Sequence, residues 1–197
     1  MIKALIGYGG HAKEVMRQMN IILPCFVSDN YLTNETIPLS KFNPAKYIVM
    51  IAVSNSIDRY NIVNQLPKET KYFTWIHNTA LIMDNNIEIG DGSFIGAYSI
   101  LTTNIKLGNH TILNRANHIG HDCTIGNYFT ALPGSIVSGN VKIGDKVSLG
   151  TNSSIKEKIT ICDNVVIGLN SGVVKNILEP GIYGGVPVKL LKNAYIQ

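Results

Sequence analysis

The sequence predicts a small Rossmann-like α/β domain over residues 1–78, followed by an all-β parallel β-helix over residues 79–197. Two observations lead to this prediction. A strand, a glycine loop and a helical segment open the chain, and aliphatic residues recur every six positions between Thr79 and Val174. The repeat takes about half of the chain, so the residues before it need a core of their own.

The first domain is expected to alternate strands and helices. Ile2–Ile6 is apolar and leads into the glycine loop Gly7–Gly10, after which His11–Met19 places its apolar residues on one helical face. Further strands are predicted at Leu23–Val27, Tyr47–Val53 and Tyr72–Ile76, and a helix at Ile57–Gln65. This order is typical of a parallel sheet with helices on its faces.

The glycine loop suits an anion. Backbone N–H groups at the start of a helix face a phosphate well, and Asp29, after the second strand, stands where an acid often meets a ribose or base. The loop reads G-x-G-G-H rather than the dinucleotide fingerprint G-x-G-x-x-G. A tight strand-to-helix turn with a surface aspartate therefore remains an equally good interpretation.

The repeat has a period that only short strands can satisfy. In sixteen units of six residues, counted from Thr79, the fifth place is almost always aliphatic and the third place is often small, as in Ser93 and Ser99. An α-helix would spread a period of six around its surface, whereas strands alternate sides every second residue. Places three and five then point inward, and three strands with three corners close one coil of a β-helix.

The corners are expected at places six, one and two of each unit. Gly-Asn or Gly-Asp pairs recur there, and these residue types tolerate the left-handed backbone of a tight bend. The pairs are Gly90-Asp91, Gly108-Asn109, Gly126-Asn127 and Gly144-Asp145. After Val174 the period breaks: Lys175–Ile177 is expected to leave the prism, and Ile182–Val186 to add a last strand.

Three histidines of the repeat are candidates for chemistry. The places of His110 and His118 in their units predict that both face outward, and His121 opens its unit at a corner beside Asp122. His121 can serve as a general base oriented by Asp122, or it can be a solvated corner residue. A metal site with His118 and Cys123 is a weaker alternative, because Cys123 should point inward; no metal ligands are assigned.

Composition narrows the function classes. The formal net charge is +4 without a Lys/Arg cluster, which favours anionic small molecules over nucleic acid. No apolar run approaches the roughly 20 residues of a membrane span. Three scattered cysteines and no signal peptide lead us to expect reduced thiols in a cytoplasmic protein.

Two segments, Ile6–His11 and His121–Gly126, resemble those of sugar acetyltransferases of the left-handed β-helix class, and Gly139–Gly144 and Gly184–Lys189 extend the resemblance over the whole chain. The related enzymes make bacillosamine- or perosamine-type 4-amino sugars, or O-acetylate sialic acid. The resemblance implies a left-handed helix, a homotrimer with active sites between neighbours, and acetyl-CoA as co-substrate.

The same resemblance assigns roles to individual residues. His121 would be the base, with Asp122 beside it, and the Gly139 N–H would meet the oxyanion. The first domain would bind the nucleotide of a nucleotide-linked amino sugar. Its assigned substrate-binding residues are Gly7, Gly9, Gly10, His11, Asp29, Ser54, Asn55 and Arg59, with Asn114 from the repeat. The assigned acetyl-CoA-binding residues are Thr130, Gly139, Gly150, Gly168, Pro187 and Lys189.

The function expected from this resemblance is N-acetylation of a nucleotide-linked 4-amino-4,6-dideoxyhexose for a bacterial surface glycan. Some relatives carry a second histidine where this chain has Thr130, so no second histidine is assigned a role. Sugar or sialic acid O-acetylation is the main alternative. A metalloenzyme resembling γ-carbonic anhydrases and a non-catalytic binding protein are the others.

Overall fold

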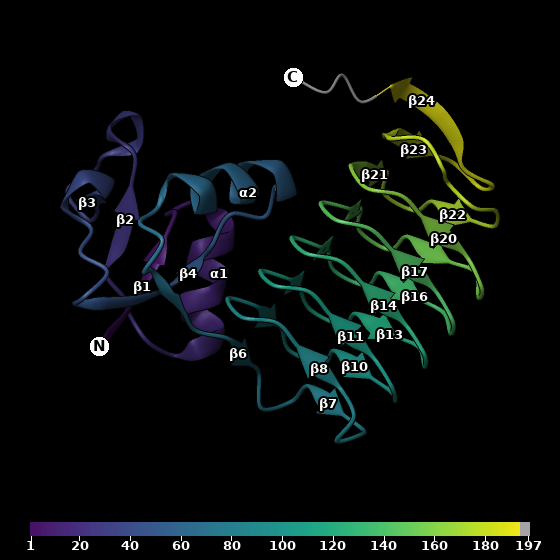
Figure 1. Cartoon of the computed structure of the whole chain (residues 1–197), viewed down its shortest axis with the longest axis horizontal. Helices are drawn as coiled ribbons and strands as arrows, with labels where there is room; N and C mark the ends of the chain where they lie inside the picture. The colour runs from purple at the N-terminus through teal and green to yellow at the C-terminus, as the bar shows by residue number, and fades with distance from the viewer. Residues whose placement is uncertain (194–197) are drawn as a thin grey trace.

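The structure of the chain is a computed structural model, and it describes residues 1–193. The last four residues of the predicted second domain, 194–197, lie outside the described part. An α/β domain stands beside a stack of coils, and the two are joined near β6 (Trp75–Ile76) (Figure 1). The predicted fold class is confirmed in both halves.

The first domain is a five-stranded parallel sheet in the order β3-β2-β1-β4-β5. Its strands are β1 (Ile2–Ile6), β2 (Cys25–Val27), β3 (Ile37–Pro38), β4 (Tyr47–Ile51) and β5 (Lys71–Tyr72). Its helices are α1 (Gly10–Met19) and α2 (Ser56–Gln65), with short 3-10 turns η1 (Asp29–Tyr31) and η2 (Leu39–Lys41). The segment predicted as one strand over Tyr72–Ile76 divides instead between β5 and β6.

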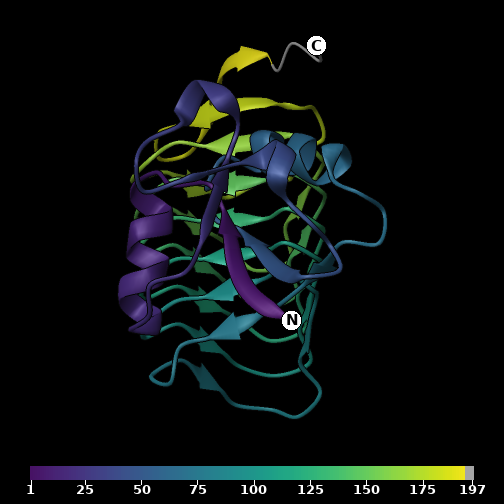
Figure 2. The same cartoon turned by 90° about the vertical axis from the view of Figure 1, so that its left-hand side faces the viewer.

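The two faces of this sheet bury different partners because successive strand residues point to opposite sides. Leu5 and Met50 pack with Ala12 and Val15 of α1, and this cluster continues into Phe94 of the β-helix. Residues of the other face pack with Ile62 and Val63 of α2. Helix α1 is therefore enclosed between the sheet and the β-helix, and the view in Figure 2 places the first domain in front of the coils.

The β-helix consists of three parallel sheets, which we name by their first strands. The β6 face contains β6, β9 (Phe94–Ile95), β12 (Ile112–Leu113), β15 (Thr130–Ala131), β18 (Ser148–Leu149), β21 (Val165–Ile167), β23 (Gly181–Gly184) and β24 (Lys189–Asn193). The β7 face contains β7 (Leu81–Ile82), β10 (Ile100–Leu101), β13 (His118–Ile119), β16 (Ile136–Val137), β19 (Ser154–Ile155) and β22 (Gly172–Val173). The β8 face contains β8 (Glu88–Ile89), β11 (Lys106–Leu107), β14 (Thr124–Ile125), β17 (Lys142–Ile143) and β20 (Thr160–Ile161).

The inward places of the repeat form one continuous core. Residues one coil apart pair in register, as Leu101 does with Ile119, so that place-five side chains stack in columns. From Ile95 upward these side chains are buried, and the place-three residues Ser93 and Ser99 are fully buried as well. Each buried aliphatic side chain contributes roughly 1.5–3 kcal/mol, which together fix the register of the coils.

The corners are built differently from the sequence prediction. Every second-place residue from Gly92 to Asn170 has a positive φ, whatever its type, including Tyr98 and Lys146. The recurring glycines serve close approach instead, because a Cβ on Gly108 would lie 2.5 Å from the backbone of Gly126. The Asn and Asp residues after these glycines accept backbone hydrogen bonds from the coil before, as Asn127 Oδ1 does from Asn109 N at 2.9 Å.

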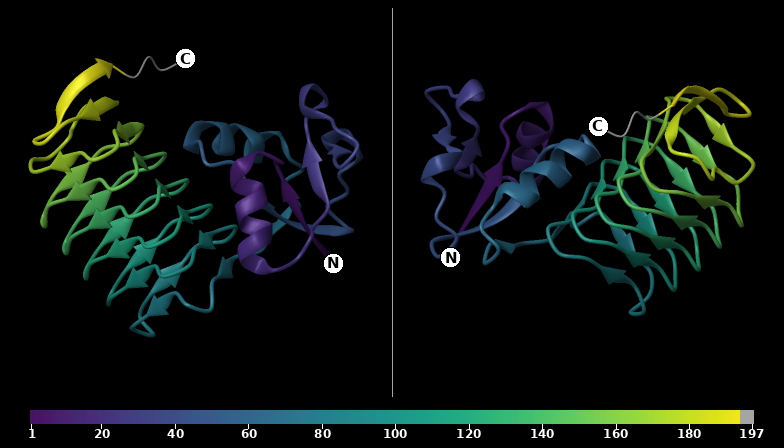
Figure 3. Two further views of the ribbon diagram at one scale, coloured as in Figure 1. Left: turned by 180° about the vertical axis from the view of Figure 1, so that it is seen from behind. Right: turned by 45° about the horizontal axis from the view of Figure 1, so that its top comes forward.

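The C-terminal end departs from the prediction in one place. Ile177 is buried and bridges to Ile161, so the prism continues past the point where we expected it to end. The last strand expected over Ile182–Val186 is β23, at Gly181–Gly184; it pairs in parallel with β21, and β24 folds back antiparallel to it over the last coil (Figure 3). No helix among the described residues is long and apolar enough to cross a membrane.

Candidate active site

His121 and Asp122 lie on the edge between the β7 and β8 faces, since they connect β13 to β14. We call this the His121 edge. Nδ1 of His121 lies 2.7 Å from Oδ2 of Asp122, and both side chains are about half exposed, at 55% and 44%. Asp122 has a positive φ of 58°, which turns its carboxylate toward the neighbouring ring. The sequence prediction that these two residues form an exposed pair therefore agrees with the geometry.

This contact fixes which ring nitrogen of His121 is basic. An ionised carboxylate only accepts hydrogen bonds, so Nδ1 carries the proton that faces Asp122, and Nε2 is the nitrogen that can exchange a proton with a substrate. The pKa of Asp122 lies below its usual value because Asn104, and then His121, donate hydrogen bonds to it. Asp122 is thus an anion at neutral pH, and Nε2 is available to accept a proton.

Gly139 lies one coil above His121, directly against its ring. A Cβ added to Gly139 would approach Nε2 of His121 to 2.5 Å, so only glycine leaves room for the imidazole in this position. Within residues 1–193 the Gly139 N–H has no hydrogen-bond acceptor, whereas the next N–H, of Asn140, donates to His121 O at 2.8 Å. A free backbone donor beside a basic nitrogen can stabilise an oxyanion during acyl transfer.

A cavity with a volume of about 810 Å³ lies in the first domain. Gly7, Gly9, Gly10 and His11 line one side of it, and Ser54 lines another. Gly7 has a φ of +109° and fits against Val53, so its backbone requires glycine. Gly9 and Gly10 have open space where a side chain would be, so packing does not require glycine there and a ligand can approach the backbone.

Helix α1 begins at this cavity. Its N-cap, Gly9, provides no side-chain hydrogen bond, and its first turn carries no acidic residue. The N–H groups of a first helical turn have no partner within the helix and attract anions. Two residues that line the cavity bond to each other: Tyr8 Oη donates to Glu35 Oε2 at 2.7 Å, which joins the glycine loop to the segment before β3.

Two histidines at the domain interface are held neutral. His11 meets Phe94 edge-on, and neither of its buried ring nitrogens has a partner within residues 1–193. Burial, with a smaller effect of Arg59, lowers the pKa of His11 to about 4. His110 was predicted to face outward, but only 4% of it is exposed, because it packs between Tyr72 and Tyr128. That prediction was wrong because the first domain covers its corner.

Arg59 is completely buried and joins the two domains. Its guanidinium donates to His110 O at 2.9 Å, to Tyr128 O at 2.8 Å and to Thr130 Oγ1 at 2.8 Å, and also to carbonyls before α2. Thr130 in turn donates to Ser54 O at 2.8 Å. The structure therefore corrects two expectations, since Arg59 and Thr130 are occupied inside the interface and cannot reach a nucleotide or a cofactor.

Three other expected substrate residues lie apart from the cavity lining. Asn55 caps α2 by accepting from Ile57 N and Asp58 N, at 2.9 and 3.0 Å. Asp29 is exposed in η1, between the lining residues Ser28 and Tyr31. Asn114 is 5% exposed and accepts from Arg115 N at 2.7 Å, close to α1. The cap on α2 gives Asn55 a structural role, whereas Asp29 borders the cavity.

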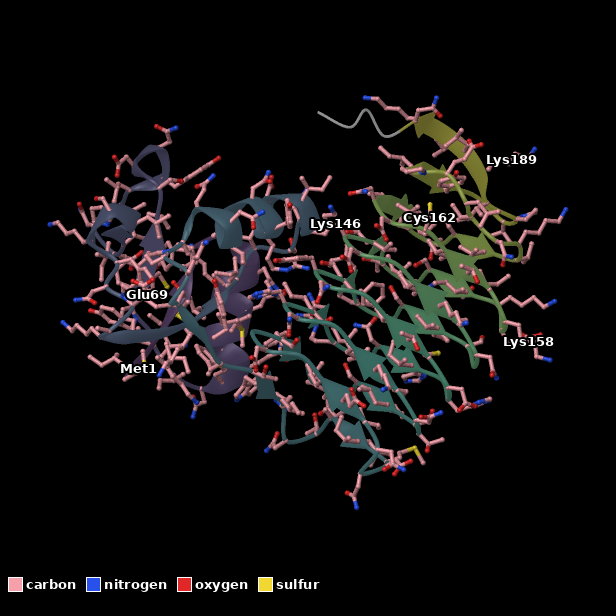
Figure 4. The ribbon with its side chains drawn as sticks, in the orientation of Figure 1. Met1, Glu69, Lys146, Lys158, Cys162 and Lys189 are labelled. Carbon is pink, nitrogen blue, oxygen red and sulfur yellow. The ribbon has the colours of Figure 1, made fainter. Side chains whose placement is uncertain are left out.

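The remaining expected acetyl-CoA residues lie on a different edge from His121. Gly150 and Gly168 each follow a strand of the β6 face and precede one of the β7 face. The β23–β24 hairpin, with exposed Pro187 and Lys189, packs beside them, and Gly168 N donates to Tyr183 O at 2.8 Å. Figure 4 labels Lys189 at this end, and Lys158, on the His121 edge, on the side away from the first domain.

Asn104 was not predicted as part of the site. Its Nδ2 donates to Asp122 Oδ1 at 2.6 Å. The signal was present in the sequence, because Asn104 precedes Asp122 by 18 residues, which is one coil. The described residues contain no group of three His, Cys, Asp or Glu side chains that could hold a metal ion, and Cys123 is buried with a raised pKa, chiefly through that burial.

The same architecture occurs in proteins of known structure. No protein-family profile and no curated protein sequence matches the chain. Among solved structures, WeeI from Acinetobacter baumannii AYE is 27% identical, with a TM-score of 0.85 over 97% of this chain and 100% of that one. The acetyltransferase domain of PglB from Neisseria gonorrhoeae FA1090 is 24% identical, with a TM-score of 0.83 over 96% and 98%.

A third match was solved with two ligands bound. PerB from Caulobacter crescentus, in complex with CoA and GDP-perosamine, is 21% identical, with a TM-score of 0.85 over 96% of this chain and 97% of that one. The PglB domain has also been solved with acetyl coenzyme A. Over nearly its whole length, the chain therefore has the two-domain left-handed β-helix fold of the PglB acetyltransferase domain and of PerB.

Proposed function

We propose that the chain is an acetyl-CoA-dependent N-acetyltransferase that acts on a nucleotide-linked amino sugar, with a 4-amino-4,6-dideoxyhexose as the expected acceptor. The observation that carries the proposal is the arrangement on the His121 edge. An imidazole whose Nδ1 lies 2.7 Å from a carboxylate oxygen stands next to a free backbone N–H of Gly139. The similarity to the PglB domain and PerB over both domains supports the same chemistry.

The reaction proposed for this site is direct acyl transfer. The sugar amine attacks the thioester carbonyl, a C–N bond forms, and the amine proton passes to Nε2 of His121. The Gly139 N–H stabilises the tetrahedral oxyanion. The C–S bond then breaks, and the CoA thiolate takes up the proton from His121. Asp122 holds the imidazolium during this exchange without itself leaving its anionic form.

The cavity of the first domain is proposed to hold the nucleotide. Gly9 and Gly10 leave their backbone open, and the first turn of α1 offers unpaired N–H groups to a diphosphate. His11 lines the same cavity with two unpartnered ring nitrogens within the described chain. Its low pKa, about 4, keeps it neutral, so it adds no charge beside the bound diphosphate.

These sites are on different sides of one chain, which leads us to propose a homotrimer. The first domain packs on the β6 face, where Phe94 and Ile112 are buried, and the His121 edge is the edge opposite that face. A sugar bound in the first-domain cavity therefore reaches a His121 only if that histidine comes from a neighbouring chain. The acetyl-CoA groove would be completed by residues of the other chain of that pair, the one that does not supply His121: Gly150, Gly168, Pro187 and Lys189.

The outer surfaces of the β-helix indicate which face meets the neighbour. The β8 face presents charged and hydroxyl side chains to solvent, and its Lys106 and Glu88 form an ion pair of 3.0 Å. The β7 face instead presents Leu81 and Ile136, which are 51% and 43% exposed, alongside the exposed polar residues His118 and Ser154. Exposed aliphatic side chains on one face of a regular prism are typical of a subunit interface. We place the trimer contact along the β7 face.

An acetyl-CoA consumption assay tests this function. The purified protein is offered acetyl-CoA with UDP-, dTDP- and GDP-linked 4-amino-4,6-dideoxyhexoses, and thiol release is followed together with the mass of the product. We expect turnover with one of these amines, in a reaction that belongs to the cytoplasmic synthesis of surface glycans. Thiol release with hydroxyl acceptors such as sialic acid, and none with the amines, would replace N-acetylation by O-acetylation. Absence of thiol release with both sets would overturn the proposal.

A further inference from the structure

We propose that Asn104 is a positioning residue, which holds the carboxylate of Asp122 and thereby the imidazole of His121 in the orientation needed for proton removal. This inference rests on the proposed function, in which His121 is the general base. Asn104, Asp122 and His121 then form a hydrogen-bonded chain that spans two coils on one edge of the prism.

The geometry gives each oxygen of Asp122 its own donor. Oδ1 accepts from Nδ2 of Asn104 at 2.6 Å, and Oδ2 faces Nδ1 of His121 at 2.7 Å. Because an ionised carboxylate cannot donate, the amide of Asn104 must present its nitrogen to Asp122. The two contacts define the plane of the carboxylate, and that plane determines the direction of the His121 ring.

Hydrogen bonds also hold the backbone beneath the Asn104–Asp122–His121 network. Asn104 and Asp122 occupy equivalent left-handed positions, with φ of 51° and 58°. Asp122 N donates to Thr103 O at 3.1 Å, and the hydroxyl of Thr103 donates to Asp84 one coil further down. Asp122 is otherwise half exposed, so without Asn104 its carboxylate is free to rotate toward water.

The alternative is that Asn104 is only a structural residue, like the other corner Asn and Asp residues that form hydrogen bonds from one coil to the next. The chain contains a comparison pair: Asn127 Nδ2 donates to Asp145 Oδ1 at 3.3 Å, also one coil apart, but without a neighbouring imidazole, and Asn127 Oδ1 in addition accepts from Asn109 N at 2.9 Å. If Asn104 were merely structural, removing its amide would lower kcat no more than removing that of Asn127, which makes more structural contacts. If Asn104 positions the base, only its removal affects proton transfer.

The experiment compares Asn104→Ala with Asn127→Ala in the full chain. For Asn104→Ala we expect kcat to fall about tenfold with the KM for acetyl-CoA unchanged, since one charge-assisted hydrogen bond is lost. For Asn127→Ala we expect the wild-type kcat. Alanine is compatible with the left-handed backbone at position 104, as Ala116 has a φ of 56° in an equivalent position. Equal kcat in the two variants would overturn the inference.

A second variant separates the loss of the hydrogen-bond donor from a change in folding. Asn104→Asp keeps the shape and the tolerance for positive φ, but it replaces the donor by an acceptor and sets a like charge against Asp122. We expect its kcat to be at least as low as that of Asn104→Ala, with an unchanged melting temperature. Wild-type turnover in Asn104→Asp would contradict the positioning role.

Two NMR readouts separate this inference from the proposed function, because neither needs a substrate. In ¹⁵N spectra we expect wild-type His121 to be protonated at Nδ1, and a mixture of both tautomers in Asn104→Ala. In ¹³C titrations we expect the pKa of Asp122 to rise in Asn104→Ala, since the amide is the main cause of its low value. These changes without any acyl transfer in the wild type would retain the positioning chain and reject the acetyltransferase function. An unchanged tautomer would reject the chain itself.

Discussion

The imidazole of His121 occupies the space that a side chain at position 139 would need. A methyl group on Gly139 would lie 2.5 Å from Nε2 and 2.6 Å from Cε1 of His121. Because Gly139 has no Cβ, two groups can lie against each other here. They are the nitrogen proposed to take the proton and the N–H proposed to stabilise the oxyanion. Any residue larger than glycine must turn the imidazole away.

Gly139→Ala is expected to lower kcat by about 10²-fold, because the displaced ring no longer reaches the attacking amine and the oxyanion site is distorted. The melting temperature should change little, since the clash is with a half-exposed side chain that can rotate into solvent. Steady-state kinetics and thermal unfolding of the same preparation check both statements. A variant with wild-type kcat would show that the ring position does not matter for turnover.

His121→Ala is expected to lower kcat by roughly 10²–10⁴-fold, the usual effect of losing a general base, while acetyl-CoA still binds. Isothermal titration with acetyl-CoA and a steady-state assay separate the two effects. His77→Ala is the matched control, because His77 lies in the turn after β6 and its Nδ1 contacts only Thr79. Equal loss in both variants, or no loss in His121→Ala, would remove His121 from the mechanism.

Ile136→Glu is expected to dissociate the proposed trimer. Ile136 is 43% exposed at the middle of the β7 face, and a carboxylate buried in a subunit contact lacks a partner. Thr124→Glu, at the equivalent outward place on the β8 face, should leave the assembly intact. Light scattering coupled to size-exclusion chromatography measures the mass of each variant. A wild-type protein that runs as a monomer would contradict the assembly before either variant is made.

The periodic part of this fold could be predicted from sequence because its causes are local. Alternation along a strand decides that Ile119 and Cys123 point inward, and the 18-residue coil decides that Leu101 lies next to Ile119. The His121–Asp122 contact follows in the same way, because the two residues are adjacent at a corner.

The contacts between the two domains could not be predicted in this way. Nothing local to Arg59 shows that its guanidinium will meet carbonyls of residues 110, 128 and 129. The same docking buries His110, whose place in the repeat is outward, and it occupies Thr130, which we had expected to meet acetyl-CoA. In each case the first domain covers a position that the repeat alone leaves open.

Acid should weaken the docking of the two domains through the buried histidines. Burial first, and then Arg59, lowers the pKa of both His11 and His110 to about 4 from the usual value near 6.5. Below pH 6.5 the unfolded chain binds protons that the folded chain refuses, so stability falls as the pH drops from about 6.5 to about 4. Each histidine contributes up to about 3 kcal/mol to this loss.

His110→Phe isolates one of the two contributions. Phenylalanine keeps a ring between Tyr72 and Tyr128, and it leaves no polar group unpaired, because Nδ1 of His110 has no partner within residues 1–193. We expect similar stability to the wild type at pH 7.5 and about half of its loss between pH 6.5 and 4. Urea unfolding followed by circular dichroism across this range measures both curves. Parallel curves for the two proteins would mean that protonation of His110 does not oppose folding, and that the acid sensitivity arises elsewhere.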